Sequence, residues 1–261
     1  MNNSIRRLAQ ELLLIHSPQE KAAAVRQHLV PALTIDAAAV IGEVPGIPGR
    51  SERPPLVHPS QLKTRAVGTR EGRASLIHAL THIEANAVNL ALDVIWRFDG
   101  MPERFYLDWL QVAREEALHF QLLRAHLNEV GFDYGDFPAH DGLWEMAEKT
   151  KGDLLARLAL VPRTLEARGL DASPAIKNKL VSVGDRQGAD ILDIILRDEI
   201  GHVAIGNHWY RHLCNLKGLD PVGTYAALSE AYGAKALKGP FNLEARRAAG
   251  FDEAELAQLC A

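Results

Sequence analysis

The sequence predicts an all-α fold organised around a four-helix bundle. Long stretches repeat apolar residues with the period of an α-helix, and four of these stretches carry a glutamate within the apolar stripe. The intervals between the four glutamates are 32, 50 and 33 residues. This short, long, short order is expected when two helical hairpins are joined by one long crossover between the second and third helices.

Two of the four glutamates are followed three residues later by a histidine. Glu116 precedes His119, and Glu199 precedes His202. Three residues is nearly one helical turn, so each carboxylate and its imidazole leave the same face of the helix. The apolar positions in line with Glu199 are Leu192, Leu196, Val203 and Gly206. A buried, unpaired carboxylate costs several kcal/mol, so the stripe indicates a partner for Glu199, and a divalent metal ion is a suitable one.

The other two glutamates, Glu84 and Glu166, have no histidine at that spacing. Glu84 is flanked by Ile77, Leu80 and Val88, and Glu166 follows Leu155, Ala159 and Pro162. One glutamate on each of two helices and Glu-x-x-His on each of two others is the ligand set of ferritin-like dinuclear carboxylate bundles. Carboxylate and imidazole ligands without a thiolate suit iron or manganese. The alternative is that these acids are ordinary surface or capping residues.

This ligand set predicts how two metal ions would be held. The first ion would be bound by Glu84, Glu116 and His119, and the second by Glu166, Glu199 and His202. One or two of the acids would bridge the ions. We expect two iron ions, or a manganese and iron pair, as the cofactor.

The composition of the 261-residue chain is that of a globular protein with a sizeable core, at 47% hydrophobic and 24% charged residues. The formal net charge of −4 gives no global electrostatic case for binding nucleic acid or an anionic membrane. Cys214 and Cys260 are the only cysteines, so we expect no disulfide framework. The amphipathic start and the lack of a long apolar stretch predict a cytoplasmic protein with no membrane segment.

Three regions are expected along the chain. Residues 1–70 are predicted to form N-terminal helices and an extended strap, 71–217 the four-helix bundle, and 218–261 a tail of short helices. A helix over 4–15 is followed by one starting at the capping box Ser17-Pro-Gln-Glu20, and the strap is the breaker-rich segment 42–60. The bundle helices are predicted at 73–98, 102–130, 153–168 and 185–216, with Gly131 as a C-cap and Pro162 as a kink.

Other polar residues have a structural and a functional interpretation. His78 and His82 are interpreted as satisfied or exposed histidines, with a substrate channel as the alternative, and His140 with Asp141 as capping residues. A basic run is interpreted as a solvated face, although a phosphate-bearing ligand is the alternative. This run consists of Lys63, Arg65, Arg70 and Arg73.

Several motifs together resemble an uncharacterised bacterial ferritin-like family, the domain of unknown function 455. They are Glu116-Ala-Leu-His119, Glu199-Ile-Gly-His202, His82-Ile-Glu84, His140-Asp-Gly-Leu-Trp-Glu145, Leu165-Glu-Ala-Arg-Gly-Leu170 and Gly239-Pro-Phe-Asn-Leu-Glu-Ala-Arg246. The resemblance covers nearly the whole chain and implies the bundle fold, but it does not imply a reaction.

A more distant likeness connects the chain to the tRNA methylthio-isopentenyladenosine hydroxylases, which are nonheme diiron oxygenases. Glu115-Glu-Ala-Leu-His-Phe120 and Leu165-Glu-Ala-Arg168 look like the second and third helices of those enzymes, although the strap and the tail depart from them. Similarity to diiron oxygenases also implies that Glu115 and Asp198, each just before a ligating glutamate, support a ligand histidine through its free ring nitrogen. The alternative is that both acids are solvated neighbours.

These observations predict a dinuclear-metal protein that uses dioxygen as an oxidase or hydroxylase. The substrate would be an unidentified small molecule or modified nucleotide, and a separate protein would supply electrons. The alternatives are a noncatalytic iron-binding or storage protein and a metal-free helical scaffold. About a hundred residues beyond the bundle would obstruct assembly into a storage cage, so a monomer or homodimer is expected.

Overall fold

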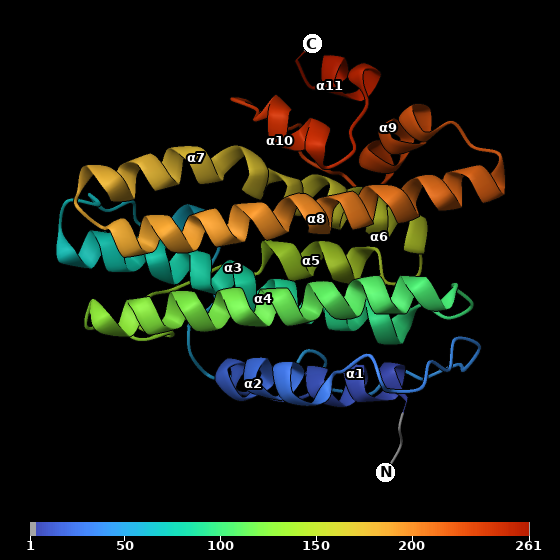
Figure 1. The fold of residues 1–261 in the computed structure, drawn as a ribbon, viewed down its shortest axis with the longest axis horizontal. Coiled ribbons are helices and arrows are strands. Elements are labelled where there is room, and N and C mark those ends of the chain that lie inside the picture. The colour runs from blue at the N-terminus through green and yellow to red at the C-terminus, as the bar shows by residue number, and fades with distance from the viewer. Residues whose placement is uncertain (1–3, 261) are drawn as a thin grey trace. The chain divides into compact units, whose positions relative to one another are not determined.

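The computed structural model describes residues 4–260, and this part of the chain is helical without a β-strand (Figure 1). Its β pairing is confined to the isolated bridges Ser4–Thr34 and Leu56–Ala139. The all-α class predicted from the sequence is therefore confirmed. Among residues 4–260, no helix combines the length and apolarity needed to cross a lipid bilayer. The chain divides into two compact units, Met1–Gly142 with Ser182–Ile191, and Leu143–Val181 with Leu192–Ala261.

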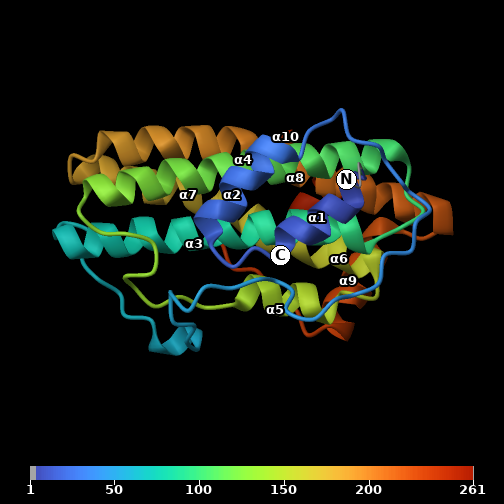
Figure 2. The ribbon, with the colours of Figure 1, turned by 90° about the horizontal axis from the view of Figure 1, so that it is seen from below.

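The first unit is built on two long antiparallel helices, α3 (Arg70–Arg97) and α4 (Glu103–Glu129), which pack along each other. Helix α1 (Ile5–Leu13) packs on α3, and α2 (Pro18–His28) packs on α4 (Figure 2). The Ser17 hydroxyl caps α2 by accepting from the Glu20 N–H at 3.3 Å, as predicted. The C-cap of α4 is Val130, one residue before the predicted Gly131, and Gly131 follows it with the positive φ of +89° that glycine favours after a helix.

The side chain of Arg6 links α1 to the C-terminal end of α3 through hydrogen bonds. Its side chain is fully buried and donates to the carbonyls of Ile95 and Trp96, in the last turn of α3, at 3.2 and 2.8 Å. It also donates to three carbonyls of the segment after α2, those of Asp36, Ala37 and Ala39. The carbonyls at a helix C-terminus carry partial negative charge, so they favour a cation there.

Replacing Arg6 with methionine is expected to lower the free energy of unfolding by about 3 kcal/mol or more, because five carbonyls lose a charged donor. Denaturant titration measures the change. The matched control is Arg7→Met on the next residue of α1, which is half-buried and for which we expect a change within about 0.5 kcal/mol. Equal effects of the two substitutions would contradict this role for Arg6.

The strap reaches the loop that follows α4. The Val57 N–H donates to the Ala139 carbonyl at 2.8 Å, and Arg50 forms a two-pronged ion pair with Asp141 at 2.7 and 2.8 Å. A 3-10 turn, η1 (Pro59–Gln61), then leads toward α3. These bonds join the strap to the loop between α4 and α5 (Gly142–Lys149).

His78 holds the same loop to α3. The Gly135 N–H donates to His78 Nε2 at 3.0 Å, and the Tyr134 ring stacks on the imidazole at 5.3 Å. Burial lowers the pKa of His78 to about 4, although Asp136 and Asp133 act in the opposite direction. The neutral ring that accepts a hydrogen bond is therefore the stable form, and His78 is a satisfied histidine as predicted.

This burial of a neutral imidazole predicts a pH dependence of stability. In the unfolded chain His78 takes up a proton near pH 6.5, whereas in the folded protein it resists protonation until about pH 4. The stability that the neutral imidazole contributes is therefore complete above pH 6.5 and is lost as the pH falls to 4. We expect the free energy of unfolding to fall by up to about 3 kcal/mol between pH 6.5 and pH 4. In His78→Gln, which keeps an acceptor but cannot titrate, unfolding free energies measured at pH 4 and 6.5 should differ by less. An unchanged difference would contradict the assignment.

The second unit contains the remaining helices, except that Gly142, Ser182 and the first residues of α8 up to Ile191 belong to the first unit. They are α5 (Gly142–Lys149), α6 (Leu154–Leu160), the π-helix η2 (Val161–Glu166), α7 (Ala167–Ser182), α8 (Arg186–Lys217), α9 (Pro221–Ala231), α10 (Leu243–Ala248) and α11 (Glu253–Cys260). Their apolar core joins α7 and α8 to the tail through Leu170, Val203 and Phe251. The tail therefore consists of short helices, as predicted.

The predicted end of the third bundle helix at residue 168 is wrong. The helical run continues as α7 through Pro174 to Ser182. Proline has no N–H to donate to the carbonyl four residues earlier, which belongs to Leu170. The Asn242 side-chain amide donates to that carbonyl at 3.2 Å, so a residue from the tail replaces the missing hydrogen bond.

Pro162 produces a π-helical turn where the sequence indicated a kink. The turn is packed against Gly206 of α8, where an added Cβ would lie 2.6 Å from Pro162 Cβ. Such a distance is too short for a carbon contact, so only glycine allows this approach. Glu166 is the last residue of the turn and lies in the middle of a continuous helical run.

Candidate metal centre

Three of the predicted ligands meet inside the first unit. Glu84 projects from α3, and Glu116 and His119 project from one face of α4, as their three-residue spacing predicted. All three are buried, at 4%, 0% and 0% exposure. His119 Nδ1 lies 3.3 Å from Glu116 Oε2 and 3.4 Å from Glu84 Oε2. One ligand atom from each residue falls within 4.8 Å of the others, which is a spacing that one metal ion can bridge.

The electrostatics of this group favour a positive charge between the two carboxylates. Burial, reinforced by the neighbouring Glu116 carboxylate, raises the pKa of Glu84 to about 8. Burial alone would lower the pKa of His119, but the two carboxylates outweigh it and raise that pKa to about 11. Glu84 Oε2 is buried and accepts no well-formed hydrogen bond. A divalent cation fits this donor set, because it would take the place of the proton between the carboxylates and the imidazole.

The second unit brings Glu199 and His202 together on α8. Both are buried, and His202 Nδ1 lies 3.5 Å from Glu199 Oε1. Glu199 Oε2 is also buried and accepts no well-formed hydrogen bond. Glu166 is half-buried at the end of the π-helical turn, with one carboxylate oxygen shielded from solvent. Its joint binding of a metal ion with Glu199 and His202 stays a prediction.

Comparison with known proteins assigns the chain to a family. The family described as "Protein of unknown function (DUF455)" matches residues 14–257. The chain belongs to this family. The DUF455 chain is also 46% identical over 253 residues to a protein of Haemophilus influenzae described as "Uncharacterized protein", covering 92% of this chain and 88% of that relative. No solved structure matches.

The two acids expected to support ligand histidines have local partners in the DUF455 protein. Glu115 is half-buried and accepts from the Gln111 side chain at 3.1 Å. Asp198 is half-buried and accepts from Arg197 Nε at 2.8 Å. Their role beside a ligand histidine stays a prediction.

Three arginines of the basic run, which ends within the first turn of α3, contact other residues of the first unit. Arg65 pairs with Glu71 at 3.0 Å, and Arg73 lies 3.8 Å from Asp185. Arg70 donates to the Val130 carbonyl at the end of α4 at 2.6 Å. These contacts favour a structural role for the run over binding of a phosphate-bearing ligand.

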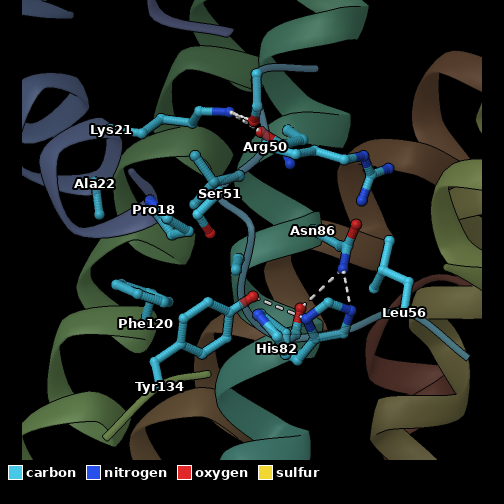
Figure 3. A pocket seen from close by; sticks show the side chains of 15 residues that line it. Pro18, Lys21, Ala22, Arg50, Ser51, Leu56, His82, Asn86, Phe120 and Tyr134 are labelled. Carbon is cyan, nitrogen blue, oxygen red and sulfur yellow. Dashed lines mark hydrogen bonds between the residues drawn. The ribbon is translucent and has the colours of Figure 1, made fainter. Parts of the chain in front are cut away.

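A small polar pocket lies between α2, α3, α4 and the strap in the first unit of the DUF455 protein (Figure 3). Its volume is about 50 Å³. Lys21 donates to the Leu13 and Gly49 carbonyls and to Asn89 at 2.6–3.2 Å, and burial lowers its pKa to about 7. His82 Nδ1 lies 2.8 Å from the Tyr134 hydroxyl. His82 therefore lines this small pocket. Its ring nitrogens have hydrogen-bond partners, so it is a satisfied histidine, as predicted.

Sequence reasoning missed the buried arginines of the DUF455 protein. Arg6, Arg163 and Arg246 are at most 3% exposed. One feature of the sequence indicates that Arg163 is buried: it directly follows Pro162 within an apolar helical pattern. A charged side chain in such a pattern requires a buried partner. The partners themselves come from distant segments, so the sequence did not reveal them.

Proposed function

We propose that this protein binds two iron ions and uses dioxygen to oxidise a small organic substrate. The observation that supports the proposal is the buried group of Glu84, Glu116 and His119, in which two carboxylates and an imidazole converge within reach of one ion. Hard oxygen ligands with an imidazole suit iron or manganese, and the group contains no thiolate that would select zinc. In carboxylate bundles of this kind, a bound iron pair supplies the electrons that reduce dioxygen.

The residues of the chain have distinct parts in this proposal. Glu84 and Glu116 supply negative charge for the first ion, and His119 supplies a neutral nitrogen ligand through Nδ1, the atom that faces both carboxylates. Buried side chains in line with these ligands on α4, including Trp109, Phe120 and Leu123, keep bulk water away from them. Glu166, Glu199 and His202 supply the corresponding set for the second ion.

Oxygen uptake by the iron-loaded protein tests the proposal. Protein loaded anaerobically with about two ferrous ions per chain is expected to consume dioxygen when mixed with aerated buffer, whereas the metal-free protein is not. Absence of iron-dependent uptake would contradict an oxidase or hydroxylase. Uptake accompanied by iron accumulation far beyond two ions per chain, in a many-subunit particle seen by light scattering, would instead identify a storage protein.

A further inference from the structure

The second unit contains a cavity that none of the predicted metal ligands lines. Its volume is about 180 Å³, and residues of η2, α9, α10 and α11 contribute to its wall. A cavity of about 150 Å³ holds a molecule of benzene, so this one has room for a compact organic molecule. Its wall combines apolar side chains, among them Tyr225, Leu237 and Phe251, with two buried arginines.

Arg163 is held in a fixed orientation, and one of its three nitrogens has no hydrogen-bond partner. Its Nη1 donates to Asn207 Oδ1 at 3.1 Å, and its Nη2 donates to Glu255. The guanidinium also lies over the rings of Tyr210, Tyr225 and Phe251, at 4.8–5.2 Å. The third nitrogen of the guanidinium, Nε, is buried without an acceptor for its N–H. Burying such a donor costs free energy unless an acceptor is supplied.

Arg246, on α10, is likewise buried, paired with a carboxylate and left with one nitrogen that has no acceptor. Its Nε and Nη2 bind the two oxygens of Asp171 at 2.9 and 2.6 Å, and the side chain is 0% exposed. Its Nη1 is buried without an acceptor, as is the hydroxyl of Ser229, which also lines the cavity. Three polar groups around one cavity therefore lack partners, whereas buried polar groups are normally hydrogen-bonded.

The charges near the cavity favour an anion. Glu255 is shared, because Arg211 Nη2 also contacts its second oxygen at 2.5 Å. Three guanidinium groups, those of Arg163, Arg211 and Arg246, therefore face the buried carboxylate of Glu255 and the half-buried carboxylate of Asp171. Asp252 lies 3.7 Å from Arg211 but is 57% exposed, so solvent screens its charge. Among the charged side chains that line the cavity itself, Arg163 and Arg246 are positive and Glu255 is negative, and this surplus of one positive charge matches a monoanion.

We propose that this cavity binds a small organic monocarboxylate. The carboxylate accepts one N–H group from Arg163 and one from Arg246, and hydrogen bonds between two ionised groups are stronger than neutral ones. The apolar body of the molecule lies against Tyr225, Leu237 and Phe251. Inorganic phosphate lacks such a body, so it does not use this wall.

Titration calorimetry with benzoate on the full chain tests the proposal. We expect saturable binding with about one site per chain and a dissociation constant near or below about 1 mM. Benzamide, which has the same ring but no charge, is expected to bind at least about tenfold more weakly, and inorganic phosphate is expected not to compete. No benzoate binding, equal binding of benzamide, or displacement by phosphate would each overturn the proposal.

Two alanines of α9 provide a matched pair of variants that leave the buried arginines intact. Ala226 lines the cavity, whereas its neighbour Ala227 does not, and both alanines are exposed to solvent. Ala226→Phe is expected to weaken benzoate binding at least about tenfold by filling the cavity, and Ala227→Phe to leave it unchanged. Equal affinity in the two variants would place benzoate elsewhere and overturn the proposal. Iron content and oxygen uptake should be normal in both, so this site and the proposed metal centre succeed or fail separately.

Discussion

Glu116→Gln is expected to weaken iron binding by the first ligand set at least about 100-fold, because loss of a residue that merely supports a ligand already costs 10- to 100-fold. The same substitution removes one of two buried carboxylates that repel each other in the metal-free protein. The metal-free variant is therefore expected to be at least as stable as the natural protein. Equilibrium iron binding and denaturant unfolding of the metal-free protein measure the two effects.

The opposite directions of these effects distinguish a ligand from a structural residue. A purely structural Glu116 would lower the stability of the metal-free protein when replaced and leave iron affinity unchanged. The matched control is Glu129→Gln at the end of the same helix, where the side chain is 59% exposed. We expect this control to change neither quantity measurably. Loss of stability without loss of iron affinity in Glu116→Gln would contradict the proposed ligand role.

Gly206→Ala is expected to lower the free energy of unfolding by about 1–3 kcal/mol, because its Cβ would overlap Pro162 in the π-helical turn. The same clash displaces the turn that ends at Glu166, so iron binding by the second ligand set should weaken as well. Thermal or denaturant unfolding measures the first effect, and iron titration measures the second.

Gly201 provides the matched control on the same helix. An added Cβ at Gly201 meets nothing within 4 Å, so Gly201→Ala relieves only the entropy cost of a helical glycine. This control is expected to stabilise the protein by about 0.5–1 kcal/mol. If the free energy of unfolding changed in the same direction in Gly206→Ala and Gly201→Ala, the close packing of Gly206 on Pro162 would be contradicted.

Features of the fold that depend on local periodicity were predictable. The apolar stripes around Glu84, Glu116 and Glu199 correctly predicted their burial, because helix geometry converts spacing into a shared face. The end of the third bundle helix was not predictable, since its continuation through Pro174 relies on Asn242, which lies 72 residues from its acceptor. The π-helical turn likewise depends on the contact between Pro162 and Gly206, which local pattern does not encode.

The candidate site shows the same division. The Glu-x-x-His spacing predicted the contacts of His119 with Glu116 and of His202 with Glu199. Spacing alone did not reveal the cavity around Arg163 and Arg246, because their partners Glu255 and Asp171 are 92 and 75 residues away. Long-range partners decide whether a buried charge serves packing or binding.

Iron-57 Mössbauer spectroscopy with metal analysis tests the central claim most directly. Protein loaded with iron-57 and exposed to air is predicted to hold about two ferric ions per chain, with a single diamagnetic spectrum from a coupled pair. Isolated paramagnetic iron, a single ion per chain, or no retained iron would contradict a dinuclear centre built from Glu84, Glu116, His119, Glu166, Glu199 and His202.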